Sequence, residues 1–199
     1  CDHSLGRVLD AMDKYNLWDD TMLILTTDHG FHLGEHDWWA FVDSPFFDQV
    51  CRKPLFIWDP RFRRRNERCA QLVQTHDLPP TLLEYFGVKR PPDMQGKVLR
   101  DAIADDVPVR DAAIFGHFGG QVNCTDGRYV YMRNPASPEN TPLYNYTLMP
   151  THMHEFFSLR ELHSAELANP FSFSKGCRVL KIQAKAFRSS QYENGTRLY

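Results

Sequence analysis

Surplus charge of one sign, long apolar runs and closely spaced cysteines are all scarce in this 199-residue sequence. Its 23 Lys and Arg residues nearly balance its 25 Asp and Glu residues, which gives a formal net charge of −2. Because a protein that neutralises phosphates over a broad face needs a basic surplus, we expect no nucleic-acid partner. The longest purely aliphatic stretch runs from Met22 to Leu25. A bilayer-spanning helix needs roughly 20 apolar residues, so we expect no membrane partner.

The five cysteines, at positions 1, 51, 69, 124 and 177, form no C-x-x-C pair. This disfavours a zinc knuckle or a thioredoxin-type motif and favours reduced thiols in a cytoplasmic protein, with disulfides as the alternative. A periplasmic or secreted protein stays open as well. The sequence starts at Cys1 without an initiator methionine or a signal-like segment. We therefore expect a chain cut from a longer one.

With 42% hydrophobic and 24% charged residues, the composition is that of a globular domain. The apolar spacing from Leu5 to Tyr15 predicts an amphipathic helix. The segment Thr21 to Thr27, which is apolar and β-branched on both faces, predicts a buried parallel strand. Further strands are predicted at Pro54–Trp58 and around Cys69–Gln74. Helices alternating with buried strands indicate an α/β fold.

Beyond these strands, a helix is predicted to begin at Asp77 and to end at Gly87. The stretch Lys89–Pro108 is predicted to be a connection with one short helix. Short β-like segments then predict a small antiparallel sheet with a hairpin at Asp126-Gly127. We also predict a helix at Met153–Leu167, a strand at Arg178–Ile182 and an exposed tail after Lys185.

The segment most suggestive of chemistry follows the first predicted strand. From Asp28 to Asp37 it holds three histidines and three carboxylates. In open α/β sheets, ligands bind beyond the carboxyl ends of the strands. An adjacent carboxylate and imidazole in that place, Asp28 and His29, can both reach one divalent cation. Gly30 and Gly34 are expected to let the backbone turn tightly around such a site.

Several stretches of the chain resemble one known family. They are Leu-Trp-Asp-Asp-Thr from Leu17, Thr-Asp-His-Gly-Phe-His-Leu-Gly-Glu-His from Thr27, Pro-Leu-Phe-Ile-Trp-Asp-Pro from Pro54, Thr-His-Asp-Leu-Pro-Pro-Thr-Leu-Leu from Thr75, Met-Gln-Gly-Lys from Met94 and Phe-Gly-Gly-Gln-Val-Asn from Phe118 with Thr-Asp-Gly-Arg-Tyr from Thr125. In order and content they resemble sulfatases and the related phosphonate monoester hydrolases of the alkaline phosphatase superfamily.

The resemblance implies the carboxyl-terminal portion of a sulfatase-like hydrolase. Residues 1–108 would be the end of an alkaline-phosphatase-like three-layer α/β/α domain, and residues 109–199 a small antiparallel-sheet subdomain of α+β type. The substrate would be a small-molecule sulfate or phosphonate ester. The missing amino-terminal part of the same chain would complete the site, and a homo-oligomer stays open.

The family's late metal-binding pair matches Asp28 and His29. The resemblance implies Ca²⁺ as the cofactor, while the imidazole of His29 leaves Mn²⁺ or Zn²⁺ as alternatives. Among the other histidines, His36 is the candidate catalytic residue, and His32 and His117 are the candidate substrate ligands.

Two departures from the family pattern bear on activity. The family's nucleophile is a formylglycine made in a C/S-x-P-x-R motif, and no Cys or Ser of this sequence lies in that context. We therefore expect these residues alone to be inactive. The family commonly has a substrate-binding lysine about twelve residues beyond the His of the metal pair, and this sequence has Phe41 there. An apolar ring cannot neutralise an anion, so a homologue with lost or altered activity is the alternative.

A competing motif overlaps the same segment. His32-Leu33-Gly34-Glu35-His36 fits H-x-x-E-H, a pattern of zinc proteases. That chemistry needs both histidines on one face of a regular helix, and Gly34 at the centre disfavours a helix. We therefore rank this alternative below the metal pair.

Overall fold

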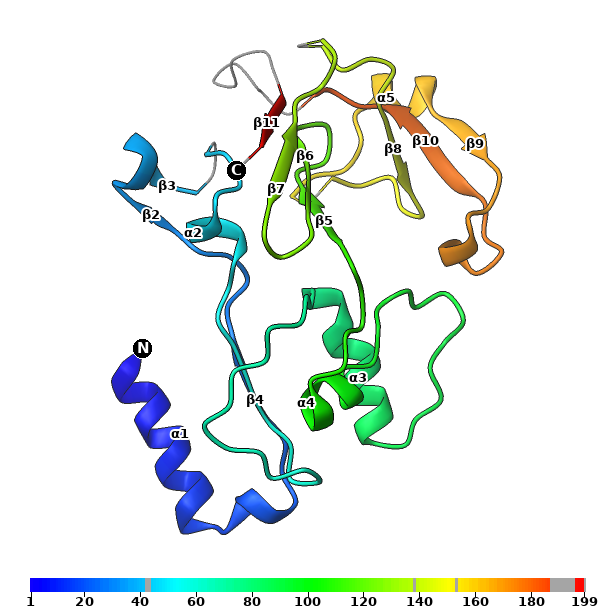
Figure 1. Ribbon diagram of the computed structural model, residues 1–199. Helices are drawn as coiled ribbons and strands as arrows, with labels where there is room; N and C mark the ends of the chain where they lie inside the picture. The colour runs from blue at the N-terminus through cyan, green and yellow to red at the C-terminus, as the bar shows by residue number, and fades with distance from the viewer. Residues whose placement is uncertain (42–43, 138, 153, 187–195, 199) are drawn as a thin grey trace.

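The structure is a computed structural model that describes residues 1–199 apart from 42–43, 138, 153, 187–195 and 199 (Figure 1). The tail predicted after Lys185 therefore lies mostly outside the described residues. Its α-helices are α1 (Asp2–Lys14), α2 (Asp48–Cys51), α3 (Leu78–Tyr85), α4 (Arg100–Asp105) and α5 (Leu159–Ser164). Short 3₁₀ turns lie at Leu17–Asp19, Glu35–Asp37, Thr75–Asp77 and Ser172–Ser174.

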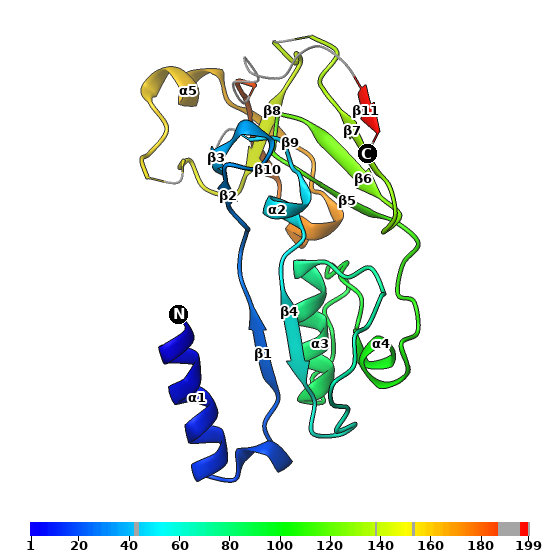
Figure 2. The same ribbon diagram turned by 60° about the vertical axis from the view of Figure 1, so that its left-hand side comes forward.

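The amino-terminal part of the chain is built around the pair β1 (Leu23–Thr26) and β4 (Leu55–Trp58). Both views place this pair between α1 and α3, so that helices lie on two sides of it (Figures 1 and 2). The predicted first helix is confirmed, and its Met12 is buried at 4% exposure. Asp2 in its first turn and Lys14 in its last turn suit the helix dipole.

The predicted direction of these strands is wrong, because β1 and β4 pair antiparallel, with Leu23 opposite Trp58. The chain between them folds as a hairpin and the one-turn helix α2, not as a helix packed across the sheet. Without such a crossover, β4 returns directly beside β1 in the opposite direction. The predicted burial on both faces is wrong as well, since Phe56 is 64% exposed and Leu25 is 37% exposed.

The strand predicted at residues 69–74 is also wrong, because the structure has no strand there. Side-chain amides rather than a backbone ladder hold this stretch. The Gln71 amide donates to the Asp106 carbonyl at 2.9 Å, and the Gln74 amide donates to the Ile114 carbonyl at 2.8 Å. The stretch therefore joins no sheet.

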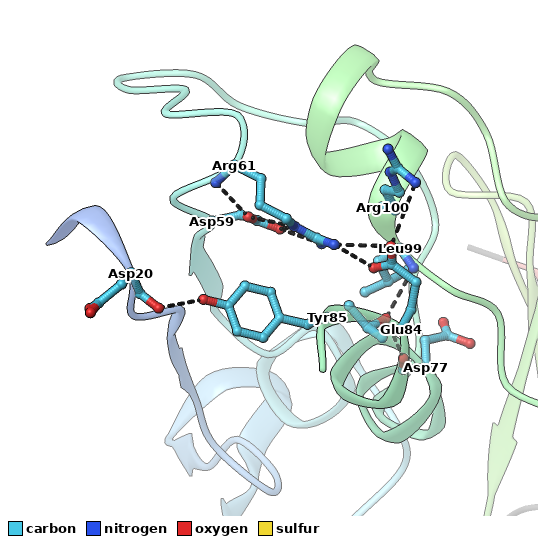
Figure 3. A network of polar contacts seen from close by, with 9 residues as sticks. Asp20, Asp59, Arg61, Asp77, Glu84, Tyr85, Leu99 and Arg100 are labelled. Carbon is cyan, nitrogen blue, oxygen red and sulfur yellow. Dashed lines mark hydrogen bonds and ion pairs between the residues drawn. The ribbon is translucent and has the colours of Figure 1, made fainter. Parts of the chain in front are cut away.

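The ends of β4, α3 and α4 are tied together by a polar network (Figure 3). The Arg61 guanidinium lies 2.7 Å from the Asp59 carboxylate and 2.9 Å from Glu84 of α3. Arg100 of α4 reaches the same Glu84 at 3.6 Å, and the Tyr85 hydroxyl donates to the Asp20 carbonyl at 2.7 Å. Because Asp59 is only 3% exposed, its pairing with Arg61 offsets part of the cost of burying the carboxylate.

A second ion pair, between Asp77 and Arg110, is buried. The predicted helix start at Asp77 is confirmed, since Asp77 closes the turn before α3 and Gly87 follows its end with a φ of 65°. One Asp77 oxygen accepts from the Lys97 N–H at 2.8 Å, and the other accepts from the Gln74 N–H at 2.7 Å. Arg110 donates to both oxygens. One carboxylate therefore fixes the start of α3, the loop before α4 and the approach to the next sheet.

The carboxyl-terminal half contains two antiparallel sheets. One has the order β11–β7–β6–β5 and the other the order β8–β10–β9. Their strands are β5 (Ala113–Gly116), β6 (Val122–Thr125), β7 (Val130–Arg133), β8 (Tyr144–Thr147), β9 (Glu166–Ala168), β10 (Val179–Gln183) and β11 (Thr196–Leu198). The predicted small sheet and its Asp126-Gly127 hairpin are confirmed. In both views these sheets lie at the end of the molecule away from the carboxyl end of α1 (Figures 1 and 2).

The helix predicted at 153–167 is much shorter in the structure, where α5 begins only after Ser158; residue 153 itself lies outside the described residues. Ser158 and Glu161 form a reciprocal capping box, with the Ser158 N–H donating to Glu161 at 2.8 Å. These bonds, with a further one from His152, lower the pKa of Glu161 to about 2. The cap fixes where the helix begins, which apolar spacing alone does not show. Across the described residues, no helix combines the length and the apolar character that crossing a bilayer requires.

We predict that Asp77→Asn lowers the free energy of unfolding by about 3–5 kcal/mol, because it leaves the buried Arg110 guanidinium without its counter-charge. Urea unfolding measures this loss. Asp111→Asn, an exposed acidic residue beside Arg110, is the matched control and should stay within about 0.5 kcal/mol of the parent protein. An equal effect of both variants would contradict the role of the pair.

The same carboxylate gives a pH dependence. Burial alone would raise the pKa of Asp77, but the bonds from Arg110, Lys97 and Gln74 outweigh it and hold the pKa below 3.8. The stabilisation is therefore full above about pH 4 and is lost as the pH falls further. Asp77→Asn should show less acid destabilisation than the parent protein.

Candidate metal site

Asp28 lies in the loop that directly follows β1, where the strand ladder ends. One of its oxygens, Oδ1, accepts from the His29 N–H at 2.9 Å and from the Thr27 hydroxyl at 3.2 Å. The bond from the His29 backbone and the charge of its imidazole lower the pKa of Asp28 below 3.8. The side chain is 84% exposed. Asp28 is therefore an oriented, charged carboxylate whose second oxygen, Oδ2, faces away from these bonds.

The imidazole of His29 is held by the carbonyl of the next residue. Its Nδ1 lies 2.9 Å from the Gly30 oxygen. A carbonyl oxygen accepts but never donates, so Nδ1 carries the hydrogen and Nε2 of the neutral ring carries the lone pair. Metal-binding histidines commonly donate their other N–H to a backbone carbonyl in this way. The tautomer of His29 is therefore the one that leaves Nε2 free to bind a cation.

The two donor atoms are spaced for a shared ion. Asp28 Oδ2 and His29 Nε2 lie 3.6 Å apart. Oxygen and nitrogen ligands sit about 2.0–2.6 Å from Zn²⁺ or Ca²⁺, which places two ligands of one ion about 3–4 Å apart. Within the ranges that the structure describes, no group of three or more His, Cys, Asp or Glu side chains is arranged so that it could hold a metal ion. The pair therefore fits one part of a divalent-metal site.

The loop is fixed in place by close contact with α2. The Gly30 N–H donates to the Val50 carbonyl at 2.9 Å, and the Phe31 N–H donates to the Gln49 carbonyl at 3.1 Å. A Cβ at Gly30 would lie 1.8 Å from the Gln49 oxygen. Gly30 therefore serves close approach to α2, whereas Gly34, at a φ of 116°, provides the tight turn that was predicted for both.

Phe41 lies against His29. The two rings are stacked, with centroids 3.7 Å apart and planes 27° apart. The nearest cations in sequence are engaged elsewhere: Arg52 pairs with Asp48 at 3.5 Å, and Lys53 donates to the Thr75 hydroxyl. The position where the family resemblance suggests a cation thus holds an apolar ring on the predicted metal ligand.

Comparisons with known proteins bear on this segment. Residues 1–88 match the family described as Sulfatase. This part of the chain is therefore similar to the sulfatase family. An N-acetylglucosamine-6-O-sulfatase of Bacteroides thetaiotaomicron is 33% identical over 106 residues, which is 53% of this chain and 18% of that protein. An arylsulfatase of Clostridium perfringens is 29% identical over 107 residues, or 52% of this chain and 22% of that protein. The chain thus spans about a fifth of the length of these relatives.

A solved structure has a similar fold. A phosphonate monoester hydrolase from Silicibacter pomeroyi superposes with a TM-score of 0.58 at 22% identity, over 67% of this chain and 30% of that one. This likeness confirms the alkaline-phosphatase-like fold predicted from the sequence. The boundary predicted at residue 108 stays a prediction.

The other predicted site histidines lie in different surroundings. His32 and His36 lie together, with ring centroids 6.2 Å apart, and the exposed His36 stacks on Phe47 at 4.0 Å. His117 is half-buried and packs on Phe46 at 4.7 Å. The predicted catalytic role of His36 and the predicted substrate contacts of His32 and His117 stay predictions.

The zinc-protease alternative is wrong. His32 and Leu33 form strand β2, which pairs with β3 (Trp39–Ala40), and Gly34 has left-handed backbone. His36 has a φ of 56°, so the segment contains no regular helix. The Glu35 carboxylate accepts from the Leu33 N–H at 2.6 Å, which lowers its pKa. Glu35 therefore closes the hairpin and cannot serve as a base between two helical zinc ligands.

Sequence reasoning missed the contacts that place the metal pair. The glycine after His29 was visible, but its packing against the Gln49 carbonyl was not. The sequence shows that Phe41 replaces a lysine that is common in the family, but it does not show that Phe41 stacks on His29. The one signal in the sequence was Gly30 itself, because a glycine that is not needed for a turn can mark a close approach between two backbones.

We predict that Gly30→Ala lowers the free energy of unfolding by about 1–3 kcal/mol, because the new methyl group would overlap backbone atoms of α2. Thermal and urea unfolding measure it. Gly6→Ala is the matched control: a Cβ at Gly6 meets nothing within 4 Å and lies within α1. That exchange should stabilise the protein by about 0.5–1 kcal/mol. A stabilising Gly30→Ala would contradict the close approach.

We predict that His32→Leu does not destabilise the protein and raises the free energy of unfolding by about 1 kcal/mol. His32 is 0% exposed, and neither ring nitrogen has a hydrogen-bond partner among the described residues. Urea unfolding tests this, with the exposed His3→Leu as the control. If His32 binds substrate as predicted, the natural full-length protein carrying His32→Leu loses hydrolysis while its stability is unchanged or higher. A loss of stability would show that His32 has bonds that stabilise the fold.

Proposed function

We propose that this chain supplies Asp28 and His29 to the divalent-metal site of a sulfate-ester hydrolase. The observation that supports this most is the 3.6 Å spacing of Asp28 Oδ2 and His29 Nε2 within a sulfatase-family segment. Matching relatives named as sulfatases support the reaction class. The overall reaction consumes one water and splits a sulfate monoester into an alcohol and hydrogen sulfate.

In this proposal each residue has a defined task. Asp28 binds through Oδ2 while Oδ1 is held by the His29 N–H, so the carboxylate does not have to reorient on binding. His29 binds through Nε2 while Nδ1 donates to the Gly30 carbonyl. A bound divalent cation would stabilise the negative charge that develops on the ester oxygens. Asp28 and His29 would hold this cation just beyond the carboxyl end of β1.

The identity of the metal and that of the substrate are also part of the proposal. The family resemblance favours Ca²⁺, whereas the nitrogen ligand His29 suits Mn²⁺ or Zn²⁺ better. A small sulfated molecule is the proposed substrate, and a sulfated amino sugar is one candidate because a relative is named for it. We also propose that these 199 residues alone do not turn over substrate, because none of their Cys or Ser residues lies in C/S-x-P-x-R.

The test uses the natural full-length protein, stripped by a chelator and reloaded with Ca²⁺, Mn²⁺ or Zn²⁺. We predict that Asp28→Asn and His29→Ala each lower metal affinity and sulfate release from an aryl sulfate. The loss should exceed the roughly 10–100-fold that is typical of residues that merely support a ligand. Metal analysis and a sulfate-release assay measure the two effects.

The controls are Asp37→Asn and His3→Ala, an exposed carboxylate and an exposed imidazole outside the pair. Both should retain metal and activity. Release of phosphonate from a phosphonate monoester, without sulfate release, would show that the substrate is a phosphonate ester. The proposed metal site would still stand. Full activity in Asp28→Asn would overturn the proposal, and metal binding without any hydrolysis would favour a non-catalytic homologue.

A further inference from the structure

We infer that Phe41 is a positioning residue that fixes the plane of the His29 imidazole for metal binding. The inference rests on the proposed function, because it concerns the proposed ligand. Its starting point is the stack of the two rings, 3.7 Å between centroids and 27° between planes. Phe41 is half-buried, and its ring centroid lies 6.2 Å from that of Phe31, with the two planes tilted by 56°. The ring of Phe41 thus contacts both the imidazole and a second aromatic side chain.

Two independent contacts are needed to fix an imidazole. The bond from Nδ1 to the Gly30 carbonyl, at 2.9 Å, points one ring edge but leaves the ring free to tilt about that bond. The face of Phe41 removes the tilt. Nε2 is then held 3.6 Å from Asp28 Oδ2, at the spacing that one ion needs. The His29 side chain is 39% exposed, so solvent leaves part of the ring unrestrained.

Phe41 is itself held from outside the loop that carries His29. It follows β3, where Ala40 pairs with His32 of β2. Ala40 has a φ of 71°, a left-handed conformation that non-glycine residues rarely adopt. The Phe41 carbonyl accepts from the hydroxyl of Ser44, which is 2% exposed. The left-handed residue and this hydrogen bond flank Phe41, so both restrain the backbone from which its ring extends.

The test compares Phe41→Leu with Phe41→Tyr in the natural full-length protein, stripped of metal and titrated with Co²⁺ alone. Leu keeps an apolar side chain and removes the ring, whereas Tyr keeps the ring. We expect Phe41→Leu to bind Co²⁺ about 10–100-fold more weakly, as for other residues that orient a ligand. Phe41→Tyr should bind within about 3-fold of the parent. The visible spectrum of the bound Co²⁺ reports nitrogen ligation and should change in Phe41→Leu only.

Circular dichroism and thermal unfolding check that each variant is folded. If Phe41→Leu does not fold, Phe41→Met, which is close to Phe in length, takes its place. Parent-like affinity and spectrum in the folded Leu or Met variant would overturn the inference, as would equal losses in Leu and Tyr.

The variant His29→Ala distinguishes a failure of the Phe41 inference from a failure of the proposed metal site. If His29→Ala loses Co²⁺ while Phe41→Leu keeps it, the site stands and Phe41 has no positioning role. If His29→Ala also keeps parent-like binding, the metal site itself is refuted.

Discussion

The candidate site depends on one backbone contact, that between Gly30 and α2. Any side chain at position 30 would meet the Gln49 carbonyl at 1.8 Å. With no side chain, the Gly30 N–H reaches the Val50 carbonyl while its own carbonyl orients His29. Val50 is 5% exposed, so α2 is anchored despite its single turn. The two hydrogen bonds of the Gly30 backbone, one to α2 and one to the imidazole, thus link the position of α2 to that of the half-exposed His29.

A similar contact supports the fold away from the site. A Cβ at Gly96 would lie 1.9 Å from the His76 carbonyl, and the next N–H, of Lys97, bonds to the buried Asp77 carboxylate. Arg110, which lies just before β5, donates a further hydrogen bond to the same carboxylate. In both places a glycine lets two backbone segments come into contact, and a polar side chain next to it forms a hydrogen bond with the backbone at that point. Backbone packing of this kind cannot repack as side chains do, so each contact fixes a loop closely.

The sequence predicted local elements well and long-range pairing poorly. The helix containing Met12, the α3 start at Asp77 and the Asp126-Gly127 hairpin are confirmed, because each depends on neighbours within a few residues. The direction of β4 depends on the whole intervening chain, and the prediction of parallel pairing was wrong. At the site, the Asp28 and His29 pair was visible as adjacent ligand types. The Gln49 and Phe41 contacts that place it lie 12 to 19 residues further along the chain and leave no local pattern.

The apolar ring at Phe41 changes how the proposed site would meet an anion. Asp28 is charged near neutral pH because its pKa is lowered, and a metal-binding His29 is neutral, so together they carry one negative charge. A divalent cation on them leaves one net positive charge, which a sulfate monoester can match. Arg52 and Lys53 are bonded to Asp48 and Thr75. Under the proposed function, the cation itself would supply the charge that faces the ester from this side. How firmly His29 is oriented then decides how well that charge is placed.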